Sequence, residues 1–193
     1  MKKIILAVAF VACTVGIYSF TTKTIKITKA GDEVYSADVA KSKVEFIGSK
    51  TDGYHTGFFA LKDGEVTIDG GKITGGKFTI NLSSLKVTDE AGEKLEGHLK
   101  STDFFDLSKS TEASFSISSV NYTATNKADI DGILTLKGIT APVKFTAYIR
   151  GVDDKKLFTE ASFSINRSAF GISYGKGKVA DDVQINVHLF AKK

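Results

Sequence analysis

Apolar and polar residues alternate strictly along most of the chain after residue 34. In residues 77–83, for example, Phe78, Ile80 and Leu82 alternate with polar side chains. Successive side chains of a strand point to opposite faces of a sheet, so a period of two predicts strands with one apolar face. The same alternation recurs in segments around residues 44–46, 66–68, 78–82, 115–117, 130–136, 143–149, 161–165 and 183–189. We therefore predict an all-β fold of about eight strands.

Turn residues separate these segments and indicate how the strands connect. Asp63-Gly64, residues 69–71 (Asp-Gly-Gly), Gly138 and residues 153–154 (Asp-Asp) lie between them. Short connections favour antiparallel neighbours. A sandwich and a closed barrel both satisfy this pattern, and closure has the advantage that it removes exposed strand edges. We favour an antiparallel eight-stranded barrel, whose interior holds side chains or one small ligand. Residues 89–99 (DEAGEKLEGHL) predict a short crossover helix.

Residues 1–20 differ from the rest of the chain. Two lysines follow Met1, and residues 4–20 are apolar or small throughout. This layout is typical of a signal peptide, with a membrane anchor as the alternative because the stretch is at the short limit of a span. Residues 21–33 are polar and predict a tether, which leaves 34–193 as one barrel domain. We expect a periplasmic or secreted protein.

Cys13 is the only cysteine, so the domain after residue 20 forms no internal disulfide. The preceding Val11-Ala12 loosely resembles the end of a lipoprotein signal, which leaves a lipoprotein or membrane-anchored form open. The net charge is +4, with basic and acidic residues interleaved. Nucleic-acid binding needs a clustered basic face, and this sequence has none. Whether the chain forms a homodimer stays open.

The candidate chemistry is sparse. The three histidines have no second histidine or cysteine at metal-ligand spacing, so we expect no metal site. His98 precedes Asp103, and such a pair could perform acid–base chemistry. No motif ties a nucleophile to it, so we favour a hydrogen bond that pins a loop or a contact with a ligand head group. We expect no catalytic residue.

Two further segments suggest loops at one end of the barrel. Phe104-Phe105 lies between Asp103 and Asp106, which indicates a turn. The pair either plugs the barrel end or lines a ligand entrance. Arg167 interrupts a strand pattern, and an arginine near an apolar interior normally has a carboxylate partner. We predict Asp103 or Asp106 as that partner, with contact to a polar ligand head group as the alternative.

These patterns define a candidate ligand site inside the barrel. The candidate lining consists of apolar side chains on the inner face and near the barrel ends: Phe46, Phe78, Ile80, Phe104, Phe105, Phe115, Leu134, Leu136, Phe145, Phe163, Ile165 and Phe170. The candidate polar rim consists of His98, Asp103, Asn166 and Arg167.

Several of the same segments resemble the YceI-like family of lipid-binding, lipocalin-like domains. They are residues 98–106 (HLKSTDFFD), 113–115 (ASF), 132–143 (GILTLKGITAPV), 166–171 (NRSAFG) and 182–185 (DVQI). The resemblance implies a lipocalin-like barrel, exported to the periplasm, that binds a polyisoprenoid or quinone-type lipid and has neither enzymatic activity nor a metal. The chain departs from the commoner pattern at Lys41-Ser42 and in lacking tryptophan.

The sequence therefore predicts non-catalytic binding of a long-chain isoprenoid or similar lipid, for transport, storage or shielding in the cell envelope. Two alternatives remain. The interior of a structural or interaction barrel would be fully packed with no ligand. A lipid-modifying enzyme would use His98 and Asp103.

Overall fold

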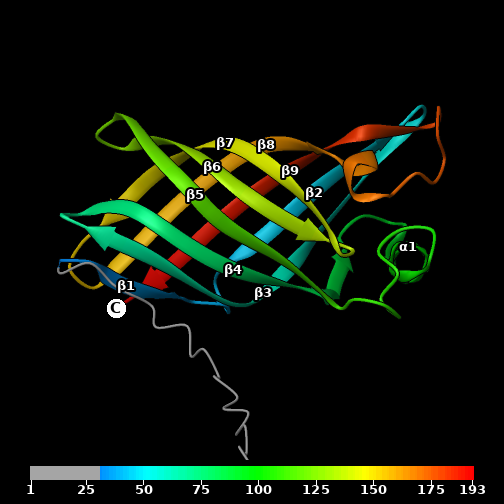
Figure 1. Ribbon diagram of the computed structural model, residues 1–193. Helices are drawn as coiled ribbons and strands as arrows, with labels where there is room; N and C mark the ends of the chain where they lie inside the picture. The colour runs from blue at the N-terminus through cyan, green and yellow to red at the C-terminus, as the bar shows by residue number, and fades with distance from the viewer. Residues whose placement is uncertain (1–30) are drawn as a thin grey trace, which may run out of the picture.

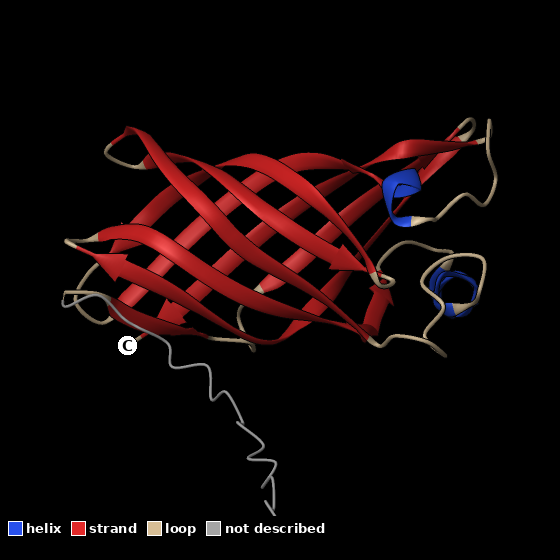
Figure 2. Ribbon diagram, in the orientation of Figure 1, coloured by secondary structure: helices blue, strands red, loops and turns tan. Residues whose placement is uncertain are grey.

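The computed structural model describes residues 31–193. The predicted signal peptide or anchor, Cys13 and nearly all of the predicted tether lie outside the described residues. The elements, shown in Figures 1 and 2, are β1 (Glu33–Ala37), β2 (Lys43–Lys50), β3 (Gly53–Asp69), β4 (Lys72–Val87), α1 (Gly92–Lys100), β5 (Glu112–Ala124), β6 (Lys127–Leu136), β7 (Ile139–Val152), β8 (Lys156–Asn166), the 3-10 helix η1 (Arg167–Phe170) and β9 (Val179–Lys192).

Eight long strands close into an antiparallel barrel, which confirms the predicted fold. Their order around the barrel is β3-β2-β9-β8-β7-β6-β5-β4, and β4 pairs back with β3. Most neighbours along the chain are also neighbours in the sheet, as expected for short connections. Closure leaves no long unpaired edge.

The ninth strand, β1, was not predicted and shares a place in the wall with β2. Both strands pair with β3 and β9, at different heights along them. The chain leaves the ladder between them at residues 38–42. The Ser42 hydroxyl replaces the missing ladder bonds, because it accepts from the Phe190 N–H at 3.0 Å and donates to the Phe190 carbonyl at 3.1 Å. Since β1 begins at Glu33, it takes up the last residue of the segment predicted as a tether.

Bulges keep apolar side chains inside the barrel along its longer strands. In β5 the register shifts between Ile117 and Ser119. Inward positions are odd-numbered before the shift, as at Phe115, and even-numbered after it, as at Val120 and Tyr122. An extra residue on one strand of a pair has this effect, because it reverses the side-chain alternation beyond it.

Helix α1 lies in the crossover from β4 to β5, close to the predicted position (Figure 1). It begins at Gly92, three residues after the predicted start at Asp89, and ends at Lys100. The helix and the segment after β8 lie at one end of the barrel, whereas β1 and the C-terminus lie at the other (Figure 1). We call these the mouth end and the closed end.

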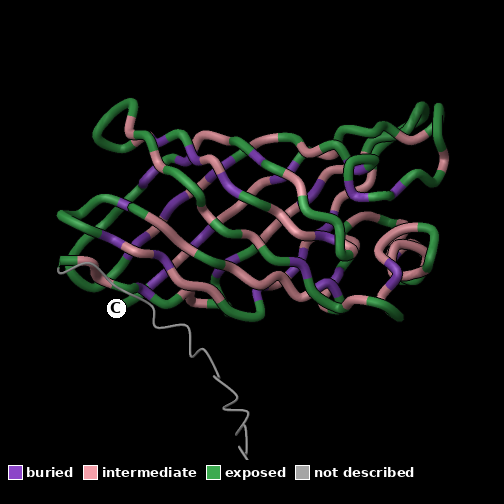
Figure 3. Tube along the Cα trace, viewed as in Figure 1, coloured by how far each residue is buried: buried purple, intermediate pink, exposed green. Residues whose placement is uncertain are grey.

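Two apolar clusters fill the inner wall. The cluster at the closed end includes Tyr35, Val66 and Leu157, all at most 2% exposed. The cluster at the mouth end includes Leu85, Phe170 and Phe59. Figure 3 shows buried positions distributed along the strands, with exposed residues at the turns. No helix among residues 31–193 has the length and apolar character needed to cross a membrane.

Candidate ligand-binding site

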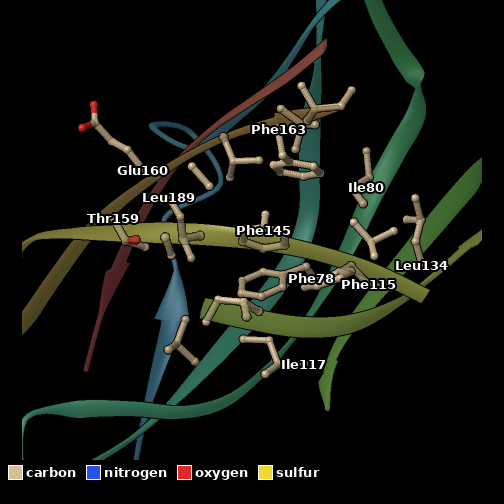
Figure 4. A pocket seen from close by; sticks show the side chains of 18 of the residues that line it. Phe78, Ile80, Phe115, Ile117, Leu134, Phe145, Thr159, Glu160, Phe163 and Leu189 are labelled. Carbon is tan, nitrogen blue, oxygen red and sulfur yellow. The ribbon is translucent and has the colours of Figure 1, made fainter. Parts of the chain in front are cut away.

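The barrel interior contains two adjoining chambers. The deep chamber has a volume of about 160 Å³ and is lined by side chains from all eight long strands (Figure 4). The outer chamber has a volume of about 340 Å³ and extends to the mouth end, where Lys50, His55 and Tyr174 contribute to its wall. The two share four lining residues, namely Val44, Ile80, Ile165 and Ile185. They therefore form one continuous apolar lining along the barrel.

Glycines on the inner wall let phenylalanine rings lie against it. An added Cβ at Gly132 would lie 2.1 Å from the ring of Phe115, and one at Gly64 would lie 2.6 Å from the ring of Phe78. A ring placed over a glycine uses space that a side chain would otherwise occupy. These rings cover the wall without filling the centre, and the chamber volume remains.

The wall of the deep chamber is almost entirely hydrocarbon. Phe145 stacks on Phe163, with ring centroids 4.4 Å apart, and lies 5.7 Å from Phe115. Two polar residues contribute to the wall. Glu160 directs its carboxylate to Arg150 and His188, while the buried Thr159 hydroxyl makes no hydrogen bond with the described residues. Unpaired polar atoms are costly here, so the chamber suits an apolar occupant.

Two phenol groups at the closed end each have a hydrogen-bond partner. The Tyr35 hydroxyl donates to the Asp153 carbonyl at 2.8 Å, and the Tyr122 hydroxyl accepts from the Ile73 N–H at 2.7 Å. Burial raises the pKa of both phenols. Both phenol oxygens are therefore engaged by the backbone at the closed end.

At the mouth end, aromatic rings from three segments meet beside the outer chamber. The ring of His98, on α1, packs edge-on against Phe104 at 5.1 Å and against Tyr174 at 4.7 Å. Phe105 packs edge-on against Phe59 at 5.3 Å. All five residues line the outer chamber. Aromatic side chains therefore form a large part of the wall at the mouth.

The turn after α1 explains how both Phe104 and Phe105 reach the interior. The Ser101 hydroxyl donates to the His98 carbonyl at 2.8 Å, and the N–H groups of Phe104 and Asp106 donate to the Ser101 carbonyl. This compact turn breaks the alternation that would point adjacent residues to opposite sides. Both aromatic side chains therefore line the outer chamber.

His98 and Asp103 are in contact, as the sequence suggested. Nε2 of His98 lies 3.2 Å from the carboxylate of Asp103, which joins α1 to the turn that follows it. The imidazole is held between two aromatic rings, and Asp103 does not line either chamber. The contact is suited to holding the turn in place.

A buried acidic network that the sequence analysis missed holds α1 against the barrel. Glu96 accepts from the Val87 N–H at 3.1 Å and from Lys86 at 3.2 Å. The hydrogen bond from Val87, followed by the hydrogen bond from Lys86 and the charges of Lys86 and Lys100, holds the pKa of Glu96 below its ordinary value despite burial. A carboxylate that accepts a backbone N–H is stabilised in its charged form.

Asp89 provides the second anchor, just before α1. Burial pushes the pKa of Asp89 upward, but hydrogen bonds from the Thr56 and Ala91 N–H groups and from His55 outweigh it and lower the pKa. Asp89 was predicted as the first residue of the helix. It instead joins the approach to α1 to strand β3.

Arg167 is 4% exposed and organises the segment between η1 and β9. Its guanidinium donates to the carbonyls of Ala180 at 2.9 Å, Ile172 at 3.2 Å and Val179 at 3.1 Å. Its carboxylate partner is Asp181, at 3.3 Å. The side chain lines the outer chamber, but most of its donors are used by the protein.

The predicted partners of Arg167 were therefore wrong. Asp103 binds His98, and Asp106 accepts from Ser108 and Lys109 within its own turn. A carboxylate partner exists, as expected for a buried arginine. It comes from the start of β9, which is brought beside η1 by the tight return of the chain.

Eleven of the twelve predicted lining residues contribute to a chamber wall. Phe78, Phe115, Leu134, Phe145 and Phe163 line the deep chamber, Phe46, Phe104, Phe105 and Leu136 the outer one, and Ile80 and Ile165 both. Phe170 lines neither chamber: it is 2% exposed and packs in the mouth-end cluster. Of the predicted rim, His98 and Arg167 line the outer chamber, whereas the Asn166 side chain accepts from the Ser168 N–H and caps η1.

Several wall residues were missed. Phe59 and Leu61 lie on β3, where bulges between Phe58 and Ala60 and between Leu61 and Asp63 disturb the alternation. Tyr174 lies in a Gly/Lys-rich loop that gives no period-two signal. Among residues 31–193, no three His, Cys, Asp or Glu side chains are grouped as a metal site would need.

Comparison with known proteins agrees with this architecture. A family profile described as the YceI-like domain matches residues 35–191. A UPF0312 protein of Pseudomonas putida strain W619 is 30% identical over 136 residues, covering 68% of this chain and 70% of the relative. Protein YceI of Escherichia coli O157:H7 is 27% identical over 190 residues, covering 96% and 95%.

Solved structures share the barrel. Burkholderia cenocepacia BcnA matches with a TM-score of 0.71 and 27% identity, covering 80% of this chain and 99% of BcnA. A polyisoprenoid binding domain from Saccharophagus degradans matches with a TM-score of 0.64 over 82% of this chain and 97% of that domain. At 15% identity the second likeness shows the fold alone.

Proposed function

This chain belongs to the YceI-like domain family, and from that premise and the shape of its interior we propose that it binds a long-chain isoprenoid or similar lipid without transforming it. The observation that carries the proposal is the pair of adjoining apolar chambers, which run from a closed floor to the mouth. The polyisoprenoid-binding domain with the same fold supports the choice of ligand class.

The energetics favour a hydrocarbon occupant. Burial stabilises by roughly 0.8 kcal/mol for each CH₂ removed from water. A lipid tail has many such groups, so an apolar tunnel provides useful affinity after the cost of ordering the tail. One methylene more or less changes binding by only about 1–3 kcal/mol. Chain length is therefore selected mainly by how far the chambers extend.

The orientation of the ligand follows from the distribution of polar groups. The deep chamber offers no hydrogen-bonding surface, and a charged or strongly polar head group would lose its hydration there. The outer chamber has Lys50, His55 and His98 in its wall. The tail would therefore enter first, with the head group left at the mouth.

The two alternatives are less well supported. A fully packed barrel would have no interior volume, whereas here the Phe115 and Phe78 rings lie against Gly132 and Gly64 and the deep chamber keeps about 160 Å³. An enzyme would need the His98–Asp103 pair to reach a substrate atom. His98 is instead held between Phe104 and Tyr174, a position that favours a structural role.

Filling the deep chamber tests the proposal. Ala161 is 7% exposed and lines this chamber, while Ser164, on the same strand, is exposed and points outward. We expect Ala161→Phe to abolish binding of a long polyprenol and to shift preference to shorter chains. Ser164→Phe should leave binding unchanged. Fluorescent polyprenol titration measures both, and equal affinities in the two variants would contradict interior binding.

We also propose that the protein acts in the cell envelope, where it transports, stores or shields its lipid. The support is the sequence of residues 1–20, a short basic start followed by an apolar run. Cell fractionation and the intact mass of the mature chain test this. A cytoplasmic protein that retains residues 1–20 would contradict it.

A further inference from the structure

We propose that the mouth of the barrel docks on an anionic lipid bilayer through a surface that we call the docking edge. It consists of residues 50–54, at the turn between β2 and β3, and residues 173–178, in the loop before β9. The inference rests on the proposed function, because it concerns how a lipid reaches the chambers. It adds the surface and the chemistry of the partner.

The docking edge has the two most exposed large apolar side chains of the described residues. Tyr54 is 63% exposed and Tyr174 is 45% exposed, whereas Ile139, which follows them, is 43% exposed. Tyrosine has an apolar ring and a polar hydroxyl, and it is enriched where proteins meet the boundary between lipid and water. Two tyrosines at the opening of an apolar chamber are therefore well placed to lie at the boundary between lipid and water.

The charge of the docking edge complements an anionic surface. It carries Lys50, Lys176 and Lys178 against one acidic residue, Asp52, which pairs with Lys50 at 3.4 Å. Lys176 and Lys178 are exposed and make no ion pair with a described residue. Lysines near an anionic membrane surface contribute attraction that falls with salt.

The acidic groups of this end belong mainly to other segments. Glu90, Glu93 and Asp103 lie on or beside α1, which lies across the mouth end from the β2–β3 turn (Figure 1) and contacts the docking edge through the His98 ring, which packs against Tyr174. Asp181 is engaged by Arg167 and Ser168. The charges therefore favour an orientation in which the docking edge, and not α1, faces the bilayer.

The two segments of the docking edge form one unit next to the outer chamber. The Thr51 N–H donates to the Lys178 carbonyl at 3.0 Å, and Lys50 pairs with Val179 in the sheet. Gly175 and Gly177 have φ of 65° and 81°, which glycine adopts without strain and which allow the loop to turn back sharply. Tyr174 and Lys50 also line the outer chamber, so the docking edge is continuous with its opening.

Docking at this position removes a physical obstacle to loading. Each CH₂ of a lipid tail that enters water costs roughly 0.8 kcal/mol, so a long tail leaves a membrane slowly through solvent. An opening held against the bilayer lets the tail pass from one apolar environment to another. The tyrosines and lysines would hold it there.

A single tryptophan can report this contact, because the chain has none. Tyr54→Trp places the probe on the docking edge, and Val152→Trp places a matched probe at the closed end, where Val152 is 37% exposed. The full chain is mixed with vesicles of phosphatidylcholine, with or without phosphatidylglycerol, that contain brominated acyl chains. We expect quenching and a blue shift at position 54 on anionic vesicles only, and neither at position 152.

The lysines are tested on the same probe. We expect Lys176→Gln with Lys178→Gln to weaken vesicle binding at least about tenfold, and Lys155→Gln with Lys156→Gln, at the closed end, to change it less than about twofold. Residues 1–30 are the same in all variants. Equal quenching at the two positions, no quenching at position 54, or equal effects of the two lysine pairs would overturn the docking edge. Polyprenol binding in solution is measured separately, so loss of docking is distinguishable from failure of the proposed function.

Discussion

Different interactions stabilise the closed end and the mouth end of this barrel. At the closed end, Tyr35, Val66 and Leu157 are buried in an apolar cluster, and the neutral hydroxyls of Tyr35 and Tyr122 bind backbone groups there. At the mouth end, buried Glu96 and Arg167 bind backbone groups at the last residue of β4 and near the start of β9. Regular strands satisfy their own backbone, whereas loops and helix approaches need side chains to do so.

The difference shows how one fold combines a fixed depth with an accessible entrance. Packed side chains at the floor set where a lipid tail must stop, because close-packed interiors resist volume change. Charged hydrogen bonds at the mouth hold segments that are not part of the barrel wall. Substitutions that disrupt one end or the other test this difference.

The largest effect is expected from Arg167→Met. It leaves three carbonyls and Asp181 without their partner, and breaking a buried charge network costs about 3–5 kcal/mol. Arg150→Met is the matched control, because Arg150 is exposed and its ion pair with Glu160 is worth about 1 kcal/mol at most. Denaturant unfolding measures both. Equal losses would show that Arg167 does not organise the mouth.

A second comparison makes the same leucine-to-alanine substitution at a floor position and at a chamber position. Leu157 is 2% exposed in the packed floor, whereas Leu134 lines the deep chamber beside existing space. Leu157→Ala should lower the free energy of unfolding by about 2–5 kcal/mol. Leu134→Ala in the ligand-free protein should cost less than about 2 kcal/mol, because fewer contacts are lost. A larger cost at Leu134 would indicate a filled interior.

The two ends should respond to opposite extremes of pH. Because the folded state lowers the pKa of Glu96, its stabilisation is present above an unfolded pKa of about 4 and is lost as the pH falls through the folded pKa. Because burial raises the pKa of Tyr35, its stabilisation is present below about pH 10 and is lost as the pH rises through the folded pKa.

Thermal unfolding across pH checks both groups. Glu96→Gln should lower the melting temperature at pH 7, and this difference from the unmodified protein should disappear well below pH 4. For Tyr35→Phe, the difference should shrink above about pH 10, where only the tyrosine protein carries the ionisation penalty. Differences that stay constant with pH would contradict these assignments.

The smallest effect is expected at Thr159, whose buried hydroxyl has no partner among the described residues. Thr159→Val keeps the shape and removes the unsatisfied group, so it should raise the free energy of unfolding by about 1 kcal/mol. Thr146→Val is the control, because the Thr146 hydroxyl donates to Asp129 at 2.8 Å. A stabilisation at both positions would point to β propensity as the cause.

The strands of the barrel were predictable because inward and outward positions differ chemically along each strand, and the family resemblance favoured a closed barrel over a sandwich. Phe115, Leu134 and Phe145 were placed on one inner face by alternation alone, and all three line the deep chamber. The family resemblance supplied the ligand class. Alternation could not reveal β1, because it spans only five residues, in which Val34 and Tyr35 are adjacent apolar side chains.

The mouth end was less predictable, because its contacts depend on the path that each loop takes between consecutive elements. Arg167 forms its ion pair with Asp181 and not with Asp103, because the chain after η1 turns back and places the start of β9 beside η1. Glu96 gave no signal in sequence, because its partner is a backbone N–H of β4. Bulges such as the one after Ile117 change which residues face inward. A single inserted residue cannot be recognised from a sequence pattern that repeats every two residues.

Organic extraction and mass spectrometry of the protein purified from its own cells test lipid binding most directly. We expect about one isoprenoid-type lipid for each unmodified chain and for Ser164→Phe, and none for Ala161→Phe. An extract without lipid from the unmodified protein, together with an experimental structure in which side chains fill both chambers, would contradict the account.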